Sequence, residues 1–258
     1  TPIDVNNSQL TIHISRTSVH VAEVLLSSQE IIKEETFQLM ESSSEGYKKA
    51  LSEVFNQFTF KDSYQEYTAA WSTPKNIFVP LGVFNESSEK SIYKLMFGKD
   101  IDESTIDYNR LMELSMVSVY EIPHWVKSFL IMKYPTIAIK HEHAMVIRAL
   151  FQKNTFKRKI NLTFNDEYIN IDIIDKNELT FSNTFEYQTV EDVVYHLLFV
   201  LRQENLMEQE GGIDLYYVGE PLKTKAEETI KILEQIKPFQ RLSIGNIDSV
   251  IKLHTLCV

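Results

Sequence analysis

The sequence predicts a mixed α/β protein, with mixed sheets, in which one order of elements occurs twice. Residues 10–24 and 160–174 both alternate apolar and polar side chains on either side of a short polar turn, which is typical of a half-buried β-hairpin. In each half the chain continues with a third strand, a helix, a strand, a helix and a strand. This repeated order, βββαβαβ, predicts two copies of one unit.

The first half is expected to begin with a three-stranded meander and a helix. The strands are predicted at 10–14, 19–25 and 31–39, and the helix at 47–58, where apolar residues recur on one face. Pro80 is expected at an edge or at the exit of a strand, because it cannot donate to a sheet. The later elements are predicted as strands at 67–72 and 76–84, a helix at 86–98, a strand at 116–122, a helix at 123–134, a strand at 136–140 and a helix at 142–153.

The second half repeats the meander and the alternation of helix and strand. Thr189, followed three residues later by Asp192, predicts a capped helix start. The elements are predicted as strands at 159–164, 168–174 and 178–187, a helix at 189–207, a strand at 213–219, a helix at 222–236 and a strand at 239–244. We therefore expect a first unit with insertions at 1–156 and a second unit at 157–258, packed together with a cleft between them.

Charge and composition exclude several classes of protein. The chain has 258 residues, 26 basic and 36 acidic, with a net charge of −10, so general binding to nucleic acid is not expected. The longest apolar runs, such as 193–201, are far shorter than the about 20 residues that span a bilayer, so no membrane insertion is expected. Cys257 is the one cysteine, which excludes an internal disulfide and fits the cytoplasm. No signal peptide is expected.

Glycine is scarce in this chain. There are seven glycines in 258 residues, under half of the average usage of about 7%. Loops that hold phosphate need glycine, because the backbone must approach the anion closely and adopt positive φ. The composition therefore argues against glycine-rich phosphate loops.

The repeated order of elements resembles the ribonuclease-H-like unit that is duplicated in actin, sugar kinases and Hsp70 chaperones. Three segments are similar to an uncharacterised bacterial family, a domain of unknown function with an actin-like ATPase fold: "TPKNIFVPLGVFN" at 73–85, "NTFEYQTVEDVVYHLLFVL" at 183–201 and "LYYVGEPLKTKAEETIKILEQI" at 215–236. The resemblance covers nearly the whole chain. It implies two ribonuclease-H-like units in an actin-like ATPase fold, and it implies no reaction.

The resemblance also implies where a nucleotide site would lie. In actin-like ATPases the first hairpin turn of each unit carries Asp-x-Gly, but the turns here read "ISRTSV" at 14–19 and "TFNDEY" at 163–168, without glycine. The candidate cleft residues are Arg16 and Thr17, which could hold an anion, Asp166, and Gly219 in place of an adenosine-side glycine pair. Each has a structural alternative: a polar turn, ordinary Asn-Asp turn chemistry and a glycine that opens a helix.

Other polar clusters do not select a mechanism. His141, Glu142 and His143 could bind zinc from a strand, but at a helix start the two histidines would diverge. His13 and His20 are expected to face each other across the first hairpin. No catalytic residue and no metal ligand is therefore assigned.

These observations leave three hypotheses for function. The first is a degenerate actin-like ATPase-fold module that binds or scaffolds a protein partner without hydrolysing ATP and without a cofactor, as in assembly platforms of pilus and secretion systems. The alternative is an ATP-dependent kinase or ATPase with divergent phosphate loops, using ATP and Mg²⁺ and a carboxylate from Asp166, Asp172 or Asp175. The third is a self-associating structural protein, which the mass in solution would reveal.

Overall fold

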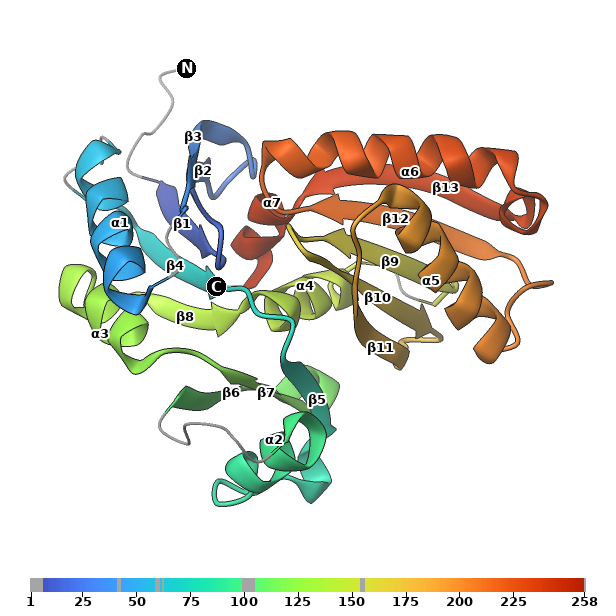
Figure 1. Cartoon of the computed structure of the whole chain (residues 1–258), viewed down its shortest axis with the longest axis horizontal. Helices are drawn as coiled ribbons and strands as arrows, with labels where there is room; N and C mark the ends of the chain where they lie inside the picture. Colours follow the sequence, from blue (N-terminus) through green and yellow to red (C-terminus); the bar gives the residue numbers. More distant parts are fainter. Residues whose placement is uncertain are drawn as a thin grey trace. The chain divides into compact units, whose positions relative to one another are not determined.

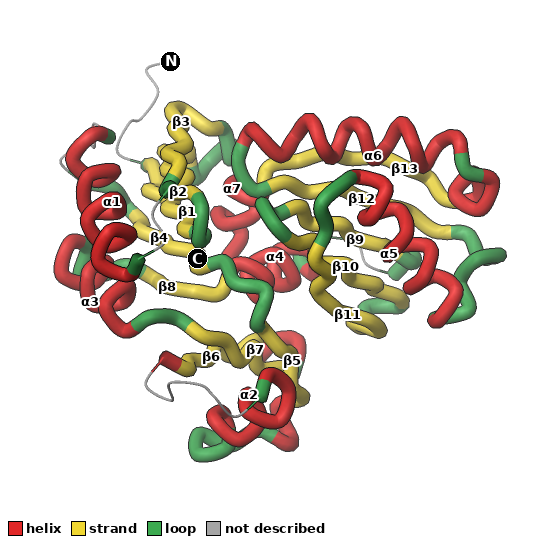
Figure 2. Tube along the Cα trace, viewed as in Figure 1, coloured by secondary structure: helices red, strands yellow, loops and turns green. Residues whose placement is uncertain are grey.

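The chain forms two compact units. A computed structural model describes residues 7–40, 43–58, 61, 63–98, 105–153 and 156–257 (Figures 1 and 2). Unit 1 contains residues 1–149 and 251–258, and unit 2 contains residues 150–250. The chain thus passes from unit 1 to unit 2 between residues 149 and 150. The domain boundary expected from the sequence, between 156 and 157, stays a prediction.

A five-stranded mixed sheet is the centre of unit 1. Its order is β3-β2-β1-β4-β8 (Figure 1). The first three strands form an antiparallel meander, and β4 and β8 run parallel to β1. The strands are β1 (Ser8–Ile14), β2 (Ser18–Leu25), β3 (Ile31–Gln38), β4 (Glu66–Trp71) and β8 (Ala138–His141). The predicted first hairpin and the pairing of His13 with His20 are both confirmed.

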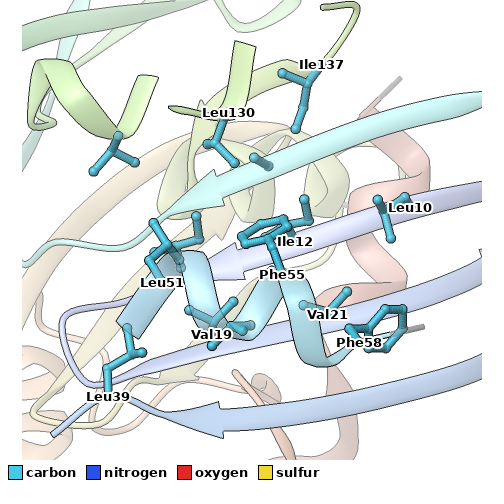
Figure 3. Close-up of a cluster of buried hydrophobic side chains, with 14 of the residues drawn as sticks. Leu10, Ile12, Val19, Val21, Leu39, Leu51, Phe55, Phe58, Leu130 and Ile137 are labelled. Carbon is cyan, nitrogen blue, oxygen red and sulfur yellow. The ribbon is translucent and has the colours of Figure 1, made fainter. Parts of the chain in front are cut away.

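Two helices cover the apolar face of this sheet. They are α1 (Ser44–Gln57) and α3 (His124–Lys133), and their buried side chains pack on alternate residues of β1 and β2 (Figure 3). Helix α1 begins three residues before its predicted start, because the side chain of Ser43 accepts a hydrogen bond from the Gly46 amide. The labelled core side chains are Leu10, Ile12, Val19, Val21, Leu39, Leu51, Phe55, Phe58, Leu130 and Ile137.

One further helix ends each half of the sequence. Helix α4 (Glu142–Phe151) follows β8, as predicted, and almost all of its residues are buried. Helix α7 (Val250–His254) and the 3-10 turn Thr255–Cys257 were not predicted. Ile251 of α7 packs against Ala22 and Val24 of β2, so the end of the chain belongs to the core of unit 1.

An insertion between β4 and α3 forms a small subdomain of unit 1. It has an antiparallel sheet of order β5-β7-β6, with β5 (Asn76–Pro80), β6 (Ile106–Leu111) and β7 (Met116–Glu121), and the helix α2 (Glu89–Phe97). Tyr93 of α2 is fully buried against Val79, Val117 and Val119. Gly98 ends α2 at φ 102°, a conformation that favours glycine. Strand β6 was not predicted.

Unit 2 repeats the topology of the first sheet. The order is β11-β10-β9-β12-β13, again with an antiparallel meander and two parallel strands. Its elements are β9 (Lys159–Phe164), β10 (Tyr168–Asp175), β11 (Glu178–Glu186), α5 (Val190–Gln203), β12 (Gly211–Tyr217), α6 (Lys223–Gln235) and β13 (Leu242–Ser249). The predicted fold class, a mixed α/β fold with duplicated βββαβαβ units, is confirmed.

Local signals explain where the helices and strands of unit 2 begin. The capping box of Thr189 and Asp192 is present at the start of α5. Several predicted limits were wrong: α5 ends at Gln203 and not at 207, and β12 spans Gly211–Tyr217 and not 213–219. Strand β13 spans Leu242–Ser249 and not 239–244, and it begins later because residues 237–241 form a 3-10 helix. Across the ranges given above, no helix is both long and apolar enough to cross a membrane.

Candidate functional site

The two hairpin turns of the duplicated units have matching backbone geometry. In unit 1 the Ser15 amide donates to the Ser18 carbonyl oxygen at 2.9 Å. In unit 2 the Asn165 amide donates to the Tyr168 carbonyl oxygen at 3.0 Å. Asn165 lies 150 residues after Ser15, so the tip residues Arg16 and Asp166 occupy equivalent positions.

A tyrosine fixes each turn from within its own unit. The Tyr47 hydroxyl donates to the Ser15 carbonyl oxygen at 2.6 Å, and the Tyr187 hydroxyl donates to the Asn165 carbonyl oxygen at 2.6 Å. Burial raises the pKa of both tyrosines, and the charge of Asp166 raises the pKa of Tyr187 further. Both phenols are therefore neutral donors at physiological pH.

In the unit 1 turn, the Ser15 side chain satisfies two of the backbone amides. The Ser15 hydroxyl oxygen accepts from the Thr17 amide at 3.3 Å and from the Ser18 amide at 3.0 Å. It also lies 3.0 Å from the Ser18 hydroxyl. Leu39, the residue after β3, adds a bond from its amide to the Thr17 carbonyl oxygen at 2.7 Å. The amides that a phosphate would need are thus engaged inside the turn.

The structure places two of the four predicted site residues in each unit. Arg16 is exposed and Thr17 is half-buried at the tip of the β1–β2 turn, and Asp166 is half-buried at the tip of the β9–β10 turn. Gly219 follows β12 with φ 80° and opens the 3-10 helix Glu220–Leu222, where its carbonyl accepts from the Leu222 amide at 3.1 Å. This geometry matches the reading of Gly219 as a glycine that opens a helix.

A row of buried polar side chains lies next to the unit 2 turn and was missed in the sequence. Asn161, Thr163 and Asn165 alternate along β9 and into the turn, and Asn170 lies on β10. For the Asn165 side chain, neither the oxygen nor the nitrogen has a hydrogen-bond partner among the described residues. The signal that could have found them is the polar half of the strand alternation. Amide and hydroxyl groups can bind a ligand by hydrogen bonds.

Unit 1 contains a buried cluster of histidines on the polar face of its sheet. His13 Nε2 lies 2.6 Å from the Ser72 hydroxyl, and the His13 ring stacks on His254 with 5.5 Å between ring centroids. His20 Nε2 lies 2.9 Å from a carboxylate oxygen of Glu34. Burial, with the nearby imidazoles, lowers the pKa of His13 well below its usual value and that of His254 to about 3.

His141 and His143 lie at the junction of β8 and α4. The His143 amide donates to His141 Nδ1 at 3.2 Å, and His141 Nε2 lies 3.2 Å from the Thr73 carbonyl oxygen. Burial, followed by the neighbouring His143, lowers the pKa of His141 to about 3. In the part of the chain that the structure describes, no three His, Cys, Asp or Glu side chains are grouped so that they could hold a metal ion.

Comparison with known proteins supplies the fold but no activity. Residues 1–239 match the family described as "Protein of unknown function (DUF3822)". Among solved structures, the chain is similar to a Bacteroides thetaiotaomicron protein with an actin-like ATPase fold and unknown function, with a TM-score of 0.75 and 20% identity over 99% of this chain and 98% of that chain. It is also similar to a chain of the PilM-PilN type IV pilus biogenesis complex, with a TM-score of 0.53 and 10% identity over 92% and 90%. No curated protein matches the sequence.

Proposed function

Because this chain belongs to the family of unknown function DUF3822 and has an actin-like ATPase fold, we propose that it is a degenerate member of that fold: a binding or scaffold module that does not hydrolyse ATP. The observation that carries this proposal is the Ser15 hydroxyl, which accepts hydrogen bonds from the Thr17 and Ser18 amides. A phosphate at this turn would have to displace both bonds, and each net hydrogen bond contributes about 1 kcal/mol.

The unit 2 turn supports the same proposal. It has no glycine, and the Tyr187 hydroxyl and the Tyr187 amide hold the carbonyls of Asn165 and Glu167. A turn that is bonded on both sides cannot easily rearrange around an anion. The fold would then serve as a rigid frame, and specificity would lie in its surface.

The partner in this proposal is another protein, and the compartment is the cytoplasm. The similar chain from a type IV pilus biogenesis complex supports the idea that this fold can serve as a component of an assembly. The single cysteine supports a reducing compartment. An acidic chain with a net charge of −10 disfavours nucleic acid as the partner.

The second candidate function is an ATP-dependent kinase or ATPase with divergent phosphate loops. One observation favours it: Asp166 lies at the tip of the unit 2 turn, where its charge acts on Tyr187. A carboxylate in this position could hold Mg²⁺ or orient a water molecule.

Release of phosphate from Mg·ATP decides between the two functions. The wild type, Asp166→Ala and the neighbouring Glu167→Ala are compared, since Glu167 is an exposed carboxylate of the same turn. We expect no Mg²⁺-dependent release from any of the three. Release by the wild type and by Glu167→Ala, but not by Asp166→Ala, would replace the scaffold proposal with the enzyme.

A further inference from the structure

Unit 1 has a small basic pocket between β6, β8 and α4. Its enclosed part measures about 10 Å³, close to the space that a single water molecule requires. The base of the pocket therefore accepts one oxygen atom of a ligand. The lining side chains that matter here are Asn109, Arg110, Leu111, Lys140, Met145 and Arg148.

Three cations surround this pocket, one from each element. Arg110 pairs with Glu86 at 2.6 Å, and Arg148 pairs with Glu113 at 2.5 Å. Lys140 has no hydrogen bond or ion pair with any side chain in the described part of the chain. Arg110 and Arg148 thus have acidic partners, whereas Lys140 has none among the described residues, in a chain whose net charge is −10.

A buried hydrogen bond joins the strands that carry Arg110 and Lys140. The Asn109 side-chain oxygen accepts from the His141 amide at 2.7 Å, and this bond ties β6 to the end of β8. Leu111 and Met145 are buried and form an apolar floor. A floor of this kind lowers the local dielectric constant and strengthens the attraction between Lys140 and an anion.

We propose that this pocket takes a glutamate or aspartate side chain from an acidic, extended segment of a protein partner. One carboxylate oxygen enters the pocket and pairs with Lys140, while Arg110 and Arg148, which stay paired with Glu86 and Glu113, add to the positive potential around it. This proposal rests on the proposed function, a scaffold that binds another protein, and it specifies that the partner presents an acidic segment. The pocket is separate in sequence from both hairpin turns.

An exposed apolar residue supports a peptide over a free small anion. Met112 follows Leu111 directly and has 61% of its surface exposed. An apolar side chain that flanks the acidic residue of a segment would cover it. A free carboxylate or phosphate would gain the charge contact alone.

Fluorescence anisotropy tests the proposal on the full chain without nucleotide. The probe is a short labelled peptide of alternating glutamate and leucine, and its control is the same peptide with glutamine in place of glutamate. We expect the glutamate peptide to bind and the glutamine peptide not to bind, with binding weakened by salt. Equal binding of the two peptides would overturn the proposal.

Substitutions locate the binding. Lys140→Ala, and Lys140→Gln as a second variant that keeps the length of the side chain, should weaken binding by about tenfold or more, since a charged hydrogen bond is lost. Lys231→Ala changes an exposed residue of α6 in unit 2 and should leave the affinity for the peptide unchanged. Wild-type affinity in a folded Lys140 variant would overturn the proposal, as would displacement of the peptide by equimolar inorganic phosphate or acetate. Because the peptide assay contains no nucleotide, a negative result in it does not affect the phosphate-release test of the proposed function.

Discussion

The phenolic hydroxyl of Tyr47 donates a 2.6 Å hydrogen bond to the carbonyl oxygen of Ser15, where β1 passes into its turn. The second unit makes the same bond, with the same length, from Tyr187 to Asn165. The two tyrosines come from different places, since Tyr47 lies inside α1 and Tyr187 precedes the cap of α5. The duplicated turns are therefore held closed by the same contact, although the residues that supply it are not equivalent in the two units.

Removing either hydroxyl should destabilise the protein measurably. Tyr47→Phe and Tyr187→Phe keep the ring but leave a buried carbonyl without its donor, so each should lower the free energy of unfolding by about 1–2 kcal/mol. Urea denaturation measures this. Tyr195→Phe is the control, because Tyr195 is 65% exposed and should change stability by less than about 0.5 kcal/mol. Equal effects at all three positions would show that the two bonds do not hold the turns.

The backbone at Gly219 requires glycine for a conformational reason. Its φ of 80° is a conformation that other residues rarely adopt. Gly219→Ala should therefore cost about 1–3 kcal/mol of stability. Gly82→Ala is the matched control, because a Cβ at Gly82 meets no atom within 4 Å and its φ is not positive. A Gly219→Ala variant as stable as Gly82→Ala would contradict the account of the helix start.

The buried histidines should make stability depend on pH. Burial lowers the pKa of His13, His141 and His254, so the folded state keeps them neutral while the unfolded state takes up protons below about pH 6.5. Stability is therefore complete above pH 6.5 and falls as the pH drops towards 3. Each of these groups contributes up to about 1.4 kcal/mol per pH unit. Chemical denaturation at a series of pH values measures this slope.

Replacing His254 separates its contribution from that of its neighbours His13 and His20, the second of which pairs with Glu34. Neither ring nitrogen of His254 has a hydrogen-bond partner within the described residues. His254→Leu should therefore keep stability at pH 8 and reduce the slope by about 1.4 kcal/mol per pH unit. The exposed His124→Leu is the control and should leave the slope as it is. An unchanged slope in His254→Leu would contradict the assigned burial effect.

The regular elements could be predicted from sequence because alternation and capping are local signals. The helix cap predicted at Thr189 and the strand predicted from the alternation of residues 10–14 illustrate this, and both were confirmed. Strand β6 was missed because "IDYNRL" has few apolar residues, and α7 because five residues give too little of a helical period.

The site depends on contacts that no local pattern contains. The glycine-free turns were visible in the sequence, but the hydrogen bonds that the Ser15 hydroxyl accepts from the Thr17 and Ser18 amides were not predicted. The bond from Tyr47 to Ser15 joins residues 32 positions apart. The stack of His13 on His254 joins the two ends of the chain. Pairings of this kind follow from tertiary packing, so they could not be predicted from the sequence.

The measurement that tests the central claim most directly is a thermal-shift titration of the wild-type chain with ATP and Mg²⁺, with ADP and with buffer alone. A ligand at a hundred times its Kd stabilises a protein by about 2.7 kcal/mol, which is readily seen as a rise in Tm. Because the Ser15 hydroxyl already occupies the Thr17 and Ser18 amides, the account predicts no shift with millimolar nucleotide. A clear, Mg²⁺-dependent rise in Tm would contradict it.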